Sequence, residues 1–285
     1  MYFDYNLTWE NWRGDRLDLT NERGGIYLDR VEGLNPVKAE LSSTSSPYID
    51  GARLNNVRIG VRNIVIYSEL RRNVEENKAL LYQLFRKKKE GTLFYKSTER
   101  DVYIKGYVED LTINQHSNPV AVQIVIVCFD PYFIDAQALV TEIARNTPKL
   151  HFALSLTEPR PFGIYSEHTT QTLTNDGDEQ LGMLIHIYAS GRAEMPKIYN
   201  DKTGEFFELG IELMAGDEIV INTKQGEHAV TLKRAAQEFN IFVAITRGSS
   251  WLQLDVGANT FGATASSGAD LLRFMLSAAE RYEGV

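Results

Sequence analysis

The stretch Ala121–Phe133 reads AVQIVIVCFDPYF, a run of Val and Ile that stops at an Asp-Pro pair followed by two aromatic residues. From Val120 to Phe129 apolar residues first alternate and then become continuous, as in a strand that is buried on at least one face. Asp130-Pro131 ends the run, because proline has no N–H to donate and restricts the residue before it. The sequence therefore predicts a buried strand over 120–129 that closes a domain core.

One amphipathic helix is predicted in the first half, over Val74–Glu90. Asn73 and Glu76 have the spacing of a capping box. Arg86–Lys89 would place cations in the last turn, where the helix dipole favours them, and Gly91 suits the position after the helix. The apolar face of this helix is predicted to consist of Leu80, Leu81, Leu84 and Phe85.

Strands and turns are predicted around this helix. Period-2 alternation favours strands at Arg58–Glu69, Gly91–Tyr95 and Asp101–Leu111. Ser42–Asp50 reads SSTSSPYID and has no periodicity, so it is predicted to be a loop. Asp135–Arg145 is predicted to form a short helix.

The length and composition are those of two globular domains. A chain of 285 residues exceeds the usual single-domain size, and 43% hydrophobic residues suffice for sizeable cores. We expect domains over residues 1–148 and 149–285. Residues 1–140 carry 18 Lys and Arg against 19 Asp and Glu, and the remainder carries 12 against 19. The acidic second half disfavours nucleic-acid binding there.

The only cysteine, Cys128, lies within the apolar run, so no intrachain disulfide is possible. We expect Cys128 to be a buried small hydrophobe rather than a nucleophile. The N-terminal segment lacks the apolar region of a signal peptide, and no apolar stretch approaches the roughly 20 residues of a membrane span. These features predict a soluble protein made in a reducing cytoplasm.

The second half is predicted to consist almost wholly of strands and turns. Turn signals recur roughly every ten residues, which is typical of a β-sandwich. The predicted strands are Leu184–Tyr188, Phe206–Ile211, Glu218–Asn222, Ala229–Leu232, Ile241–Ile245 and Trp251–Val256. A final helix is predicted over Ala269–Glu280 from apolar residues with helical spacing, namely Leu271, Leu272, Met275 and Leu276.

An ordered set of turn and strand residues runs through the second half. It comprises Asn175-Asp176-Gly177, Gly191, Pro196-x-Ile198-x-Asn200 with Thr203-Gly204, Gly216-Asp217-x-Ile219-x-Ile221-Asn222-Thr223, and Trp251-x-x-Leu254-x-x-Gly257-x-Asn259. This set resembles the C-terminal galectin-like sandwich of the distal tail proteins of long-tailed, non-contractile phages and prophages. The helix and strands of residues 55–135, which end in Cys128-x-Asp130-Pro131-Tyr132-Phe133, resemble the N-terminal domain of the same family. The resemblance covers residues 55–135 and 172–262.

This resemblance implies a mainly β protein. An α+β N-terminal domain, a β-barrel or sandwich with one long helix, would be followed by a galectin-like β-sandwich with a C-terminal extension. It implies a structural protein of the virion, assembled in the host cytoplasm, which forms a homo-hexamer or a double hexameric ring at the tail tip. The implied partners are the tail tube protein, the tail-associated fibre or lysin protein and a receptor-binding protein.

No sequence motif nominates a catalytic residue, a cofactor site or a metal site, so we expect no enzyme. The histidines are far apart in sequence: His116, His151, His168, His186 and His228. Galectins hold sugar with an H-x-N-x-R strand and a W-x-x-E-x-R strand. At the positions of the Asn, Arg and Glu this chain has Tyr188, Ser190 and Leu254, so the sugar site is not carried over. Trp251 is expected to be a core residue rather than a sugar platform.

Two other classes of function remain open. One is a carbohydrate-binding adhesion module that recognises host cell-wall glycan, and the other is a glycan hydrolase, for which no carboxylate pair is nominated. Arg86–Lys89 is a candidate for nucleic-acid contact or a solvated helix end. Basic residues facing a DNA conduit would trap the polyanion, so we expect this run to lie away from a tail lumen and expect no sequence-specific nucleic-acid binding.

Overall fold

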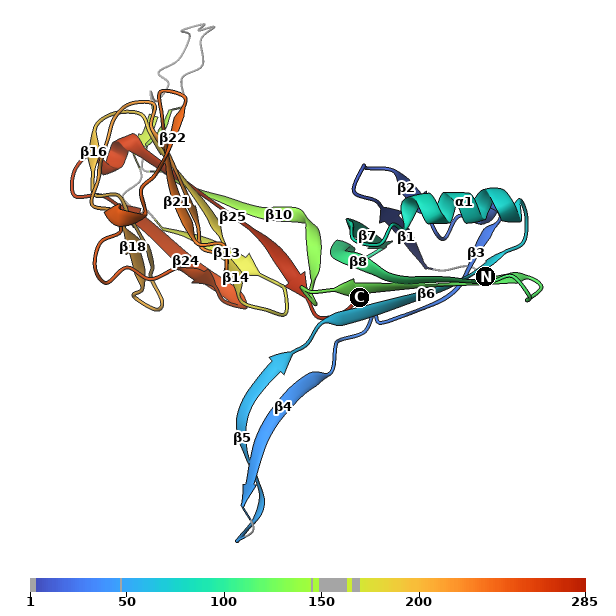
Figure 1. Ribbon diagram of the computed structural model, residues 1–285. Coiled ribbons are helices and arrows are strands. Elements are labelled where there is room, and N and C mark those ends of the chain that lie inside the picture. Colours follow the sequence, from blue (N-terminus) through green and yellow to red (C-terminus); the bar gives the residue numbers. More distant parts are fainter. Residues whose placement is uncertain (1–3, 47, 145, 149–162, 166–169) are drawn as a thin grey trace, which may run out of the picture. The chain divides into compact units, whose positions relative to one another are not determined.

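The structure, a computed structural model, describes residues 4–46, 48–144, 146–148, 163–165 and 170–285. The chain divides into two compact units, one of residues up to 137 together with 281–285, and one of residues 138–280 (Figure 1). The boundary expected after residue 148 falls beside residues 149–162, which lie outside the described residues. Antiparallel strands dominate both units, which confirms the mainly β fold class.

The strands of the first unit pair in the order β2-β1-β7-β8-β9-β6-β3. Their bounds are β1 (Tyr5–Glu10), β2 (Arg16–Asp18), β3 (Ile26–Glu32), β6 (Arg62–Leu70), β7 (Glu90–Ser97), β8 (Asp101–Asn114) and β9 (Val120–Cys128). The start of β10 (Phe133–Ala144) also pairs with β8, with Ile134 opposite Tyr103. A 3₁₀ turn, η1 (Glu22–Gly24), precedes β3.

The Val/Ile run forms β9, which confirms the strand predicted there. β9 pairs along its whole length with β6, from Val120 opposite Leu70 to Cys128 opposite Arg62, and it also pairs with β8. Its buried side chains alternate, namely Val122, Ile124, Ile126 and Cys128. This strand is therefore internal to the sheet, and its period-2 pattern supplies the core of the first unit.

Helix α1 (Val74–Leu84) is shorter than predicted, because the chain turns away after Phe85. Leu81, Leu84 and Phe85 are buried as expected, whereas Leu80, which was expected on the same face, is exposed. The capping box was a wrong prediction, since Asn73 has left-handed backbone angles and makes no side-chain capping bond. None of the helices in the described part of the chain has the length and hydropathy that a bilayer crossing requires.

The predicted helix C-terminus was also wrong, because Gly91 belongs to β7 and not to a helix cap. A Cβ atom at Gly91 would lie 2.2 Å from Cζ2 of Trp9. Trp9 in turn stacks on Phe85 with ring centroids 5.2 Å apart and donates a hydrogen bond to the carbonyl of Leu84 at 3.1 Å. Glycine is required here because the indole packs directly on the β7 backbone.

The loop predicted over Ser42–Asp50 is wrong as well. Ala39–Ser46 forms β4 and Ile49–Ile59 forms β5, and the two strands pair as a hairpin. The strand predicted over Arg58–Glu69 is divided at Gly60 and Val61 between β5 and β6. The hairpin escaped prediction because a ribbon exposed on both faces carries no hydrophobic alternation.

The second unit is a two-sheet sandwich. One sheet has the order β10-β25-β15-β20-β21-β22 and the other has the order β13-β24-β17-β18. The bounds are β13 (Thr170–Asn175), β15 (Leu184–Ala189), β17 (Lys197–Asn200), β18 (Phe206–Glu208), β20 (Glu218–Asn222), β21 (Ala229–Arg234), β22 (Gln237–Asn240), β24 (Gly257–Thr264) and β25 (Leu272–Tyr282). Ile185 and Ile219 from the first sheet share a buried core with Ile198 and Phe261 from the second.

Short pairs and turns complete this unit. The pairs are β11 (Asn146–Pro148) with β12 (Gly163–Tyr165), β14 (Leu181–Gly182) with β23 (Gln253–Leu254), and β16 (Ala193–Glu194) with β19 (Glu212–Leu213). The 3₁₀ turns are η2 (Phe242–Ala244) and η3 (Ala269–Leu271). The strand predicted over Ile241–Ile245 is therefore wrong, and those over Phe206–Ile211 and Trp251–Val256 are shorter than expected.

Both short helices predicted near the domain junction and the C-terminal end are wrong. Asp135–Arg145 falls largely in β10, and Ala269–Glu280 is η3 followed by β25. In β25 the buried positions alternate as Leu272, Phe274, Leu276 and Ala278. This period-2 set and the helical set Leu271, Leu272, Met275 and Leu276 coexist in the same residues, and pairing with β15 selects the strand.

Candidate assembly interface

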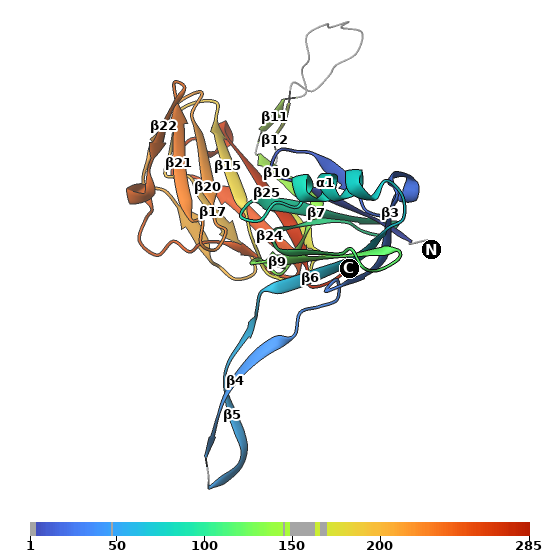
Figure 2. The same cartoon turned by 45° about the vertical axis from the view of Figure 1, so that its right-hand side comes forward.

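The β4–β5 hairpin is the most exposed element of the first unit and projects from it in Figures 1 and 2. Every side chain that the structure describes between Ala39 and Arg58 is exposed. Large apolar side chains are among them, with Tyr48 at 93% and Leu41 at 67% exposure, together with Leu54 and Val57. Such a set of exposed apolar side chains on one element is typical of a protein–protein contact.

Within the described residues, β4 and β5 pair only with each other, so their outer edges are open. A two-stranded ribbon is marginally stable by itself in water, and open edges can accept further strands. Register shifts between Ser42 and Ser43 and between Ser45 and Ser46 mark irregularities of the kind that bend a ribbon. The hairpin therefore has the properties of an element that is covered by another polypeptide.

Arg62 fixes the root of this hairpin. Its side chain is 1% exposed and donates to the carbonyl oxygens of Gly33 at 2.5 Å and Asn35 at 2.8 Å, which lie just before β4. It also donates to the carbonyl of Pro131 at 2.6 Å, and its guanidinium lies 4.7 Å from the Phe133 ring centroid. Burial lowers the pKa of Arg62 from its usual value. The hairpin is thus free along its length and held firmly where it begins.

The three residues that stand at the positions of the sugar-binding Asn, Arg and Glu of galectins lie in different environments. Leu254 is fully buried in the sandwich core. The hydroxyl of Ser190 donates to the carbonyl of Leu271 at 2.9 Å. Tyr188 stacks on His186, whose Nδ1 lies 2.9 Å from Oε1 of Glu218. The structure does not bring these three positions into one polar cluster, since Leu254 faces the core.

Trp251 is covered by other rings. The imidazole of His228 stacks on it with centroids 4.2 Å apart and planes within 4°, and Phe207 and Phe242 lie 5.0 and 5.7 Å away. Trp251 also packs against the sandwich core. It is therefore a partly buried packing residue, and the face on which a sugar could stack is occupied.

Metal-binding and nucleophilic groups are dispersed in the described part of the chain. No group of three or more His, Cys, Asp or Glu residues there is placed to hold a metal ion. His116, His186 and His228 are described, whereas His151 and His168 lie outside the described residues. Cys128 is fully buried, as predicted, and burial raises its pKa to about 12, with a smaller contribution from Asp130.

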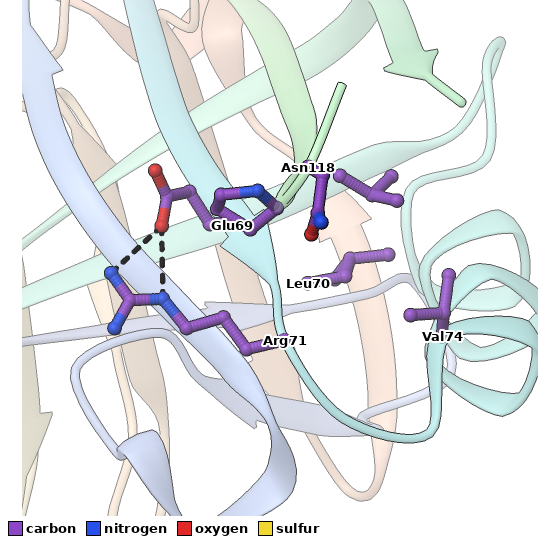
Figure 3. Close-up of a pocket in the computed structure, with 7 residues that line it drawn as sticks. Glu69, Leu70, Arg71, Val74 and Asn118 are labelled. Atoms are coloured by element: carbon purple, nitrogen blue, oxygen red, sulfur yellow. Dashed lines mark hydrogen bonds and ion pairs between the residues drawn. The ribbon is translucent and has the colours of Figure 1, made fainter. Parts of the chain in front are cut away.

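A hollow of about 410 Å³ lies between the end of β6, the start of α1 and the turn before β9 (Figure 3). It is lined by Glu69, Leu70, Arg71, Val74, Asn118, Pro119 and Val120. Arg71 pairs with Glu69, the carboxylate of this lining, at 2.9 Å. Because this ion pair engages the carboxylate, the lining has no free acid or nucleophile, and nothing in it points to catalysis.

Comparison with known proteins gives a family model that matches part of the second unit. Residues 176–274 match the family model described as siphovirus-type tail component, C-terminal domain. This match confirms the resemblance to distal tail proteins predicted from the sequence. No curated protein matches the chain.

Solved structures of phage tail proteins share the fold over almost the whole chain. A crystal structure of the Dit protein of phage SPP1, described as a paradigm of the hub of the adsorption apparatus in phages that infect Gram-positive bacteria, matches with a TM-score of 0.71 and 13% identity. That match covers 97% of this chain and 98% of the other. A chain of the phage P2 baseplate in its activated, calcium-containing conformation matches with a TM-score of 0.53 and 16% identity, over 96% and 97% of the two chains.

Proposed function

We propose that this chain, which carries the C-terminal domain of the siphovirus-type tail components, is a hub subunit of a phage or prophage tail tip. In this proposal six copies form a ring through the first unit, singly or as a double ring. The ring joins the tail tube protein to the tail-associated fibre or lysin protein and to the receptor-binding protein. The protein acts as a structural part of the virion, assembled in the host cytoplasm, and not as an enzyme.

The β4–β5 hairpin is the observation that carries the ring. It presents exposed apolar side chains and open strand edges, and its root is fixed by Arg62. If each copy lays its hairpin on the next, the contact is head to tail, and such contacts close into a ring when the rotation between copies is right. Burial of the hairpin would also supply the stabilisation that a two-stranded ribbon lacks alone.

Mass photometry of the whole chain tests the proposal. The wild type is expected to populate a species of about 194 kDa, the mass of six 32.3-kDa chains. Leu54→Asp with Val57→Asp, which places charges on the hairpin, is expected to shift this species toward monomers. The matched control is Val140→Asp with Val243→Asp, two exposed valines of the second unit, which should leave the ring intact.

A wild type that stays monomeric at all accessible concentrations would refute the proposal. A different result would be a ring that forms equally well with the charged hairpin. The second result would keep the hub assignment but remove the hairpin as the contact between copies.

A further inference from the structure

A basic and aromatic surface lies on the first unit where α1 ends, next to the β1–β2 turn. We call it the basic-turn surface, and it consists of Trp12, Arg13, Tyr82, Arg86, Lys87, Lys88 and Lys89, all of which are exposed. The guanidinium of Arg13 lies 4.6 Å and Nζ of Lys89 lies 5.1 Å from the Trp12 ring centroid. Two segments that are far apart in sequence therefore meet in one surface.

The backbone under this surface is held in place. Phe85 stacks on the buried Trp9, and Trp9 donates to the carbonyl of Leu84 at 3.1 Å. Lys88 has a φ of 67°, a left-handed conformation that is unfavourable for a residue other than glycine. Anchored and unfavourable backbone geometry under exposed side chains is more typical of a recognition site than of a passive turn.

Charge on the surface is largely uncompensated. Lys87 pairs with Asp110 at 3.1 Å. In the part of the chain that the structure describes, no carboxylate lies within ion-pair distance of Arg13, Arg86, Lys88 or Lys89. This concentration of free cations stands out in a protein of net charge −8.

A hollow of about 370 Å³ with a mixed polar and apolar lining adjoins Arg86 and Lys87. It is lined by Tyr82, Phe85, Arg86, Lys87 and Leu111, so its floor is aromatic and aliphatic and its rim is basic. Trp12 is 45% exposed and Tyr82 is 54% exposed. Trp, Tyr and Arg are the side chains that most often anchor protein–protein contacts.

We propose that the basic-turn surface is a docking site for an acidic segment of a partner protein, with an aromatic or aliphatic side chain seated in the hollow and carboxylates on its cationic rim. Charge complementarity selects an acidic ligand, and the aromatic and aliphatic part of the hollow's lining selects a polypeptide over a nucleic acid. Nucleic-acid surfaces need a wide positive field along the phosphate backbone, whereas here Asp110 pairs with Lys87 and Glu90 follows Lys89 in the chain. This inference does not depend on ring formation.

Binding of labelled peptides to the whole chain tests the proposal. The probe is a fluorescein-labelled peptide of alternating Glu and Phe residues, followed by fluorescence anisotropy at low and at physiological salt. The control probes are a peptide with Lys in place of Glu, a poly-Glu peptide and a single-stranded DNA of similar length. We expect the Glu/Phe peptide to bind more tightly than the other three, with an affinity that falls as salt rises.

A charge-reversed variant localises the binding. Arg86→Glu, Lys88→Glu and Lys89→Glu together are expected to weaken it by on the order of tenfold or more, because like charges then face the ligand. The matched control reverses Lys202, Lys224 and Arg247, three exposed cations of the second unit, and should leave the affinity within about twofold, since it makes the same change in net charge away from the ligand. Trp12→Ala, which keeps every charge, should weaken the Glu/Phe peptide more than poly-Glu.

Three outcomes overturn the proposal. The first is that the Glu/Phe peptide does not bind the wild type. The second is that the two charge-reversed variants lose peptide affinity equally. The third is that the DNA binds more tightly than the peptide and that reversal of Arg86, Lys88 and Lys89 abolishes this DNA binding. The last would make the surface a nucleic-acid site instead. Thermal unfolding of each variant tests whether a loss of affinity is caused by a loss of folded protein.

Discussion

Arg62 donates a hydrogen bond to the backbone carbonyl of Glu283, 221 residues further along the chain. The same guanidinium holds the carbonyls of Gly33, Asn35 and Pro131, so one buried side chain of β6 is bonded to three other segments of the first unit. Burying a cation is costly unless its donors are satisfied, and here the guanidinium donates to four backbone oxygens. Arg62 thus links the root of the hairpin, the end of the Val/Ile strand and residues 281–285.

Arg62→Met is expected to lower the free energy of unfolding of the first unit by about 3 kcal/mol, because four part-buried carbonyls lose their donor and each such loss costs up to about 1–3 kcal/mol. Urea denaturation followed by tryptophan fluorescence measures the loss. Arg58→Met is the matched control, since Arg58 makes an exposed pair with Glu40 that contributes less than about 1 kcal/mol. Equal effects of the two substitutions would contradict the role assigned to Arg62.

Cys128 is expected to resist thiol reagents in the folded protein, because it is fully buried and its pKa of about 12 leaves almost no thiolate near pH 8. A variant with Val243→Cys, at a position that is 97% exposed, should gain one fast-reacting thiol. Cys128→Ser is expected to destabilise by about 1–3 kcal/mol, since it places a hydroxyl in an apolar site. Fast labelling of native Cys128 would show that the strand opens readily.

The turn before β20 is expected to make the free energy of unfolding depend on pH in the acid range. Asp217 is buried and accepts hydrogen bonds from Nε of Arg234 at 2.8 Å and from the backbone N–H of Met214 at 2.8 Å. These contacts hold the pKa of Asp217 below its usual 3.8, the bond from Arg234 contributing most. The stabilisation is therefore present above pH 3.8 and is lost as the pH falls through the lower folded-state pKa.

Asp217→Asn is accordingly expected to unfold more easily at neutral pH and to lose less stability than the wild type when the pH falls below 3.8. Thermal unfolding between pH 2 and 7 measures both effects. Asp201→Asn, at an exposed turn, should reproduce the wild-type profile. If the stability of all three proteins falls equally steeply as the pH is lowered, carboxyl groups other than Asp217 govern this loss.

No binding of lactose to the whole chain is expected by isothermal titration calorimetry. Leu254 is buried, the Ser190 hydroxyl is bonded to the backbone, and His228 covers Trp251, so polar groups and a stacking face are lacking at these positions. Saturable lactose binding would contradict this expectation. Binding of host wall polysaccharide alone would favour the adhesion-module function over a purely structural one.

The parts of the fold that could be predicted are those where a single periodicity fits the residues. The apolar residues of Val120–Cys128 fit the spacing of a strand, and in β9 their side chains alternate between buried and partly exposed positions. Ala269–Glu280 could not be assigned in this way, because Leu272 and Leu276 satisfy both a helical and a strand spacing. The choice depends on β15, a strand about 90 residues earlier, which local sequence does not encode.

The exposed apolar surface of the β4–β5 hairpin could not be predicted from the sequence, for a different physical reason. Leu41, Leu54 and Val57 do not face a core of their own chain, so no periodic signal marks them. The basic run Arg86–Lys89 was recognised, but its meeting with Trp12 depends on the strand order β2-β1-β7.

The bond from Arg62 to Glu283 has a consequence for biosynthesis. A ribosome makes β6 more than 200 residues before it makes Glu283. The first unit can adopt most of its sheet while the remainder of the chain is still being translated, but the Arg62 site stays incomplete until residues 281–285 have emerged. Translation products that stop before these residues therefore carry an unfinished first unit.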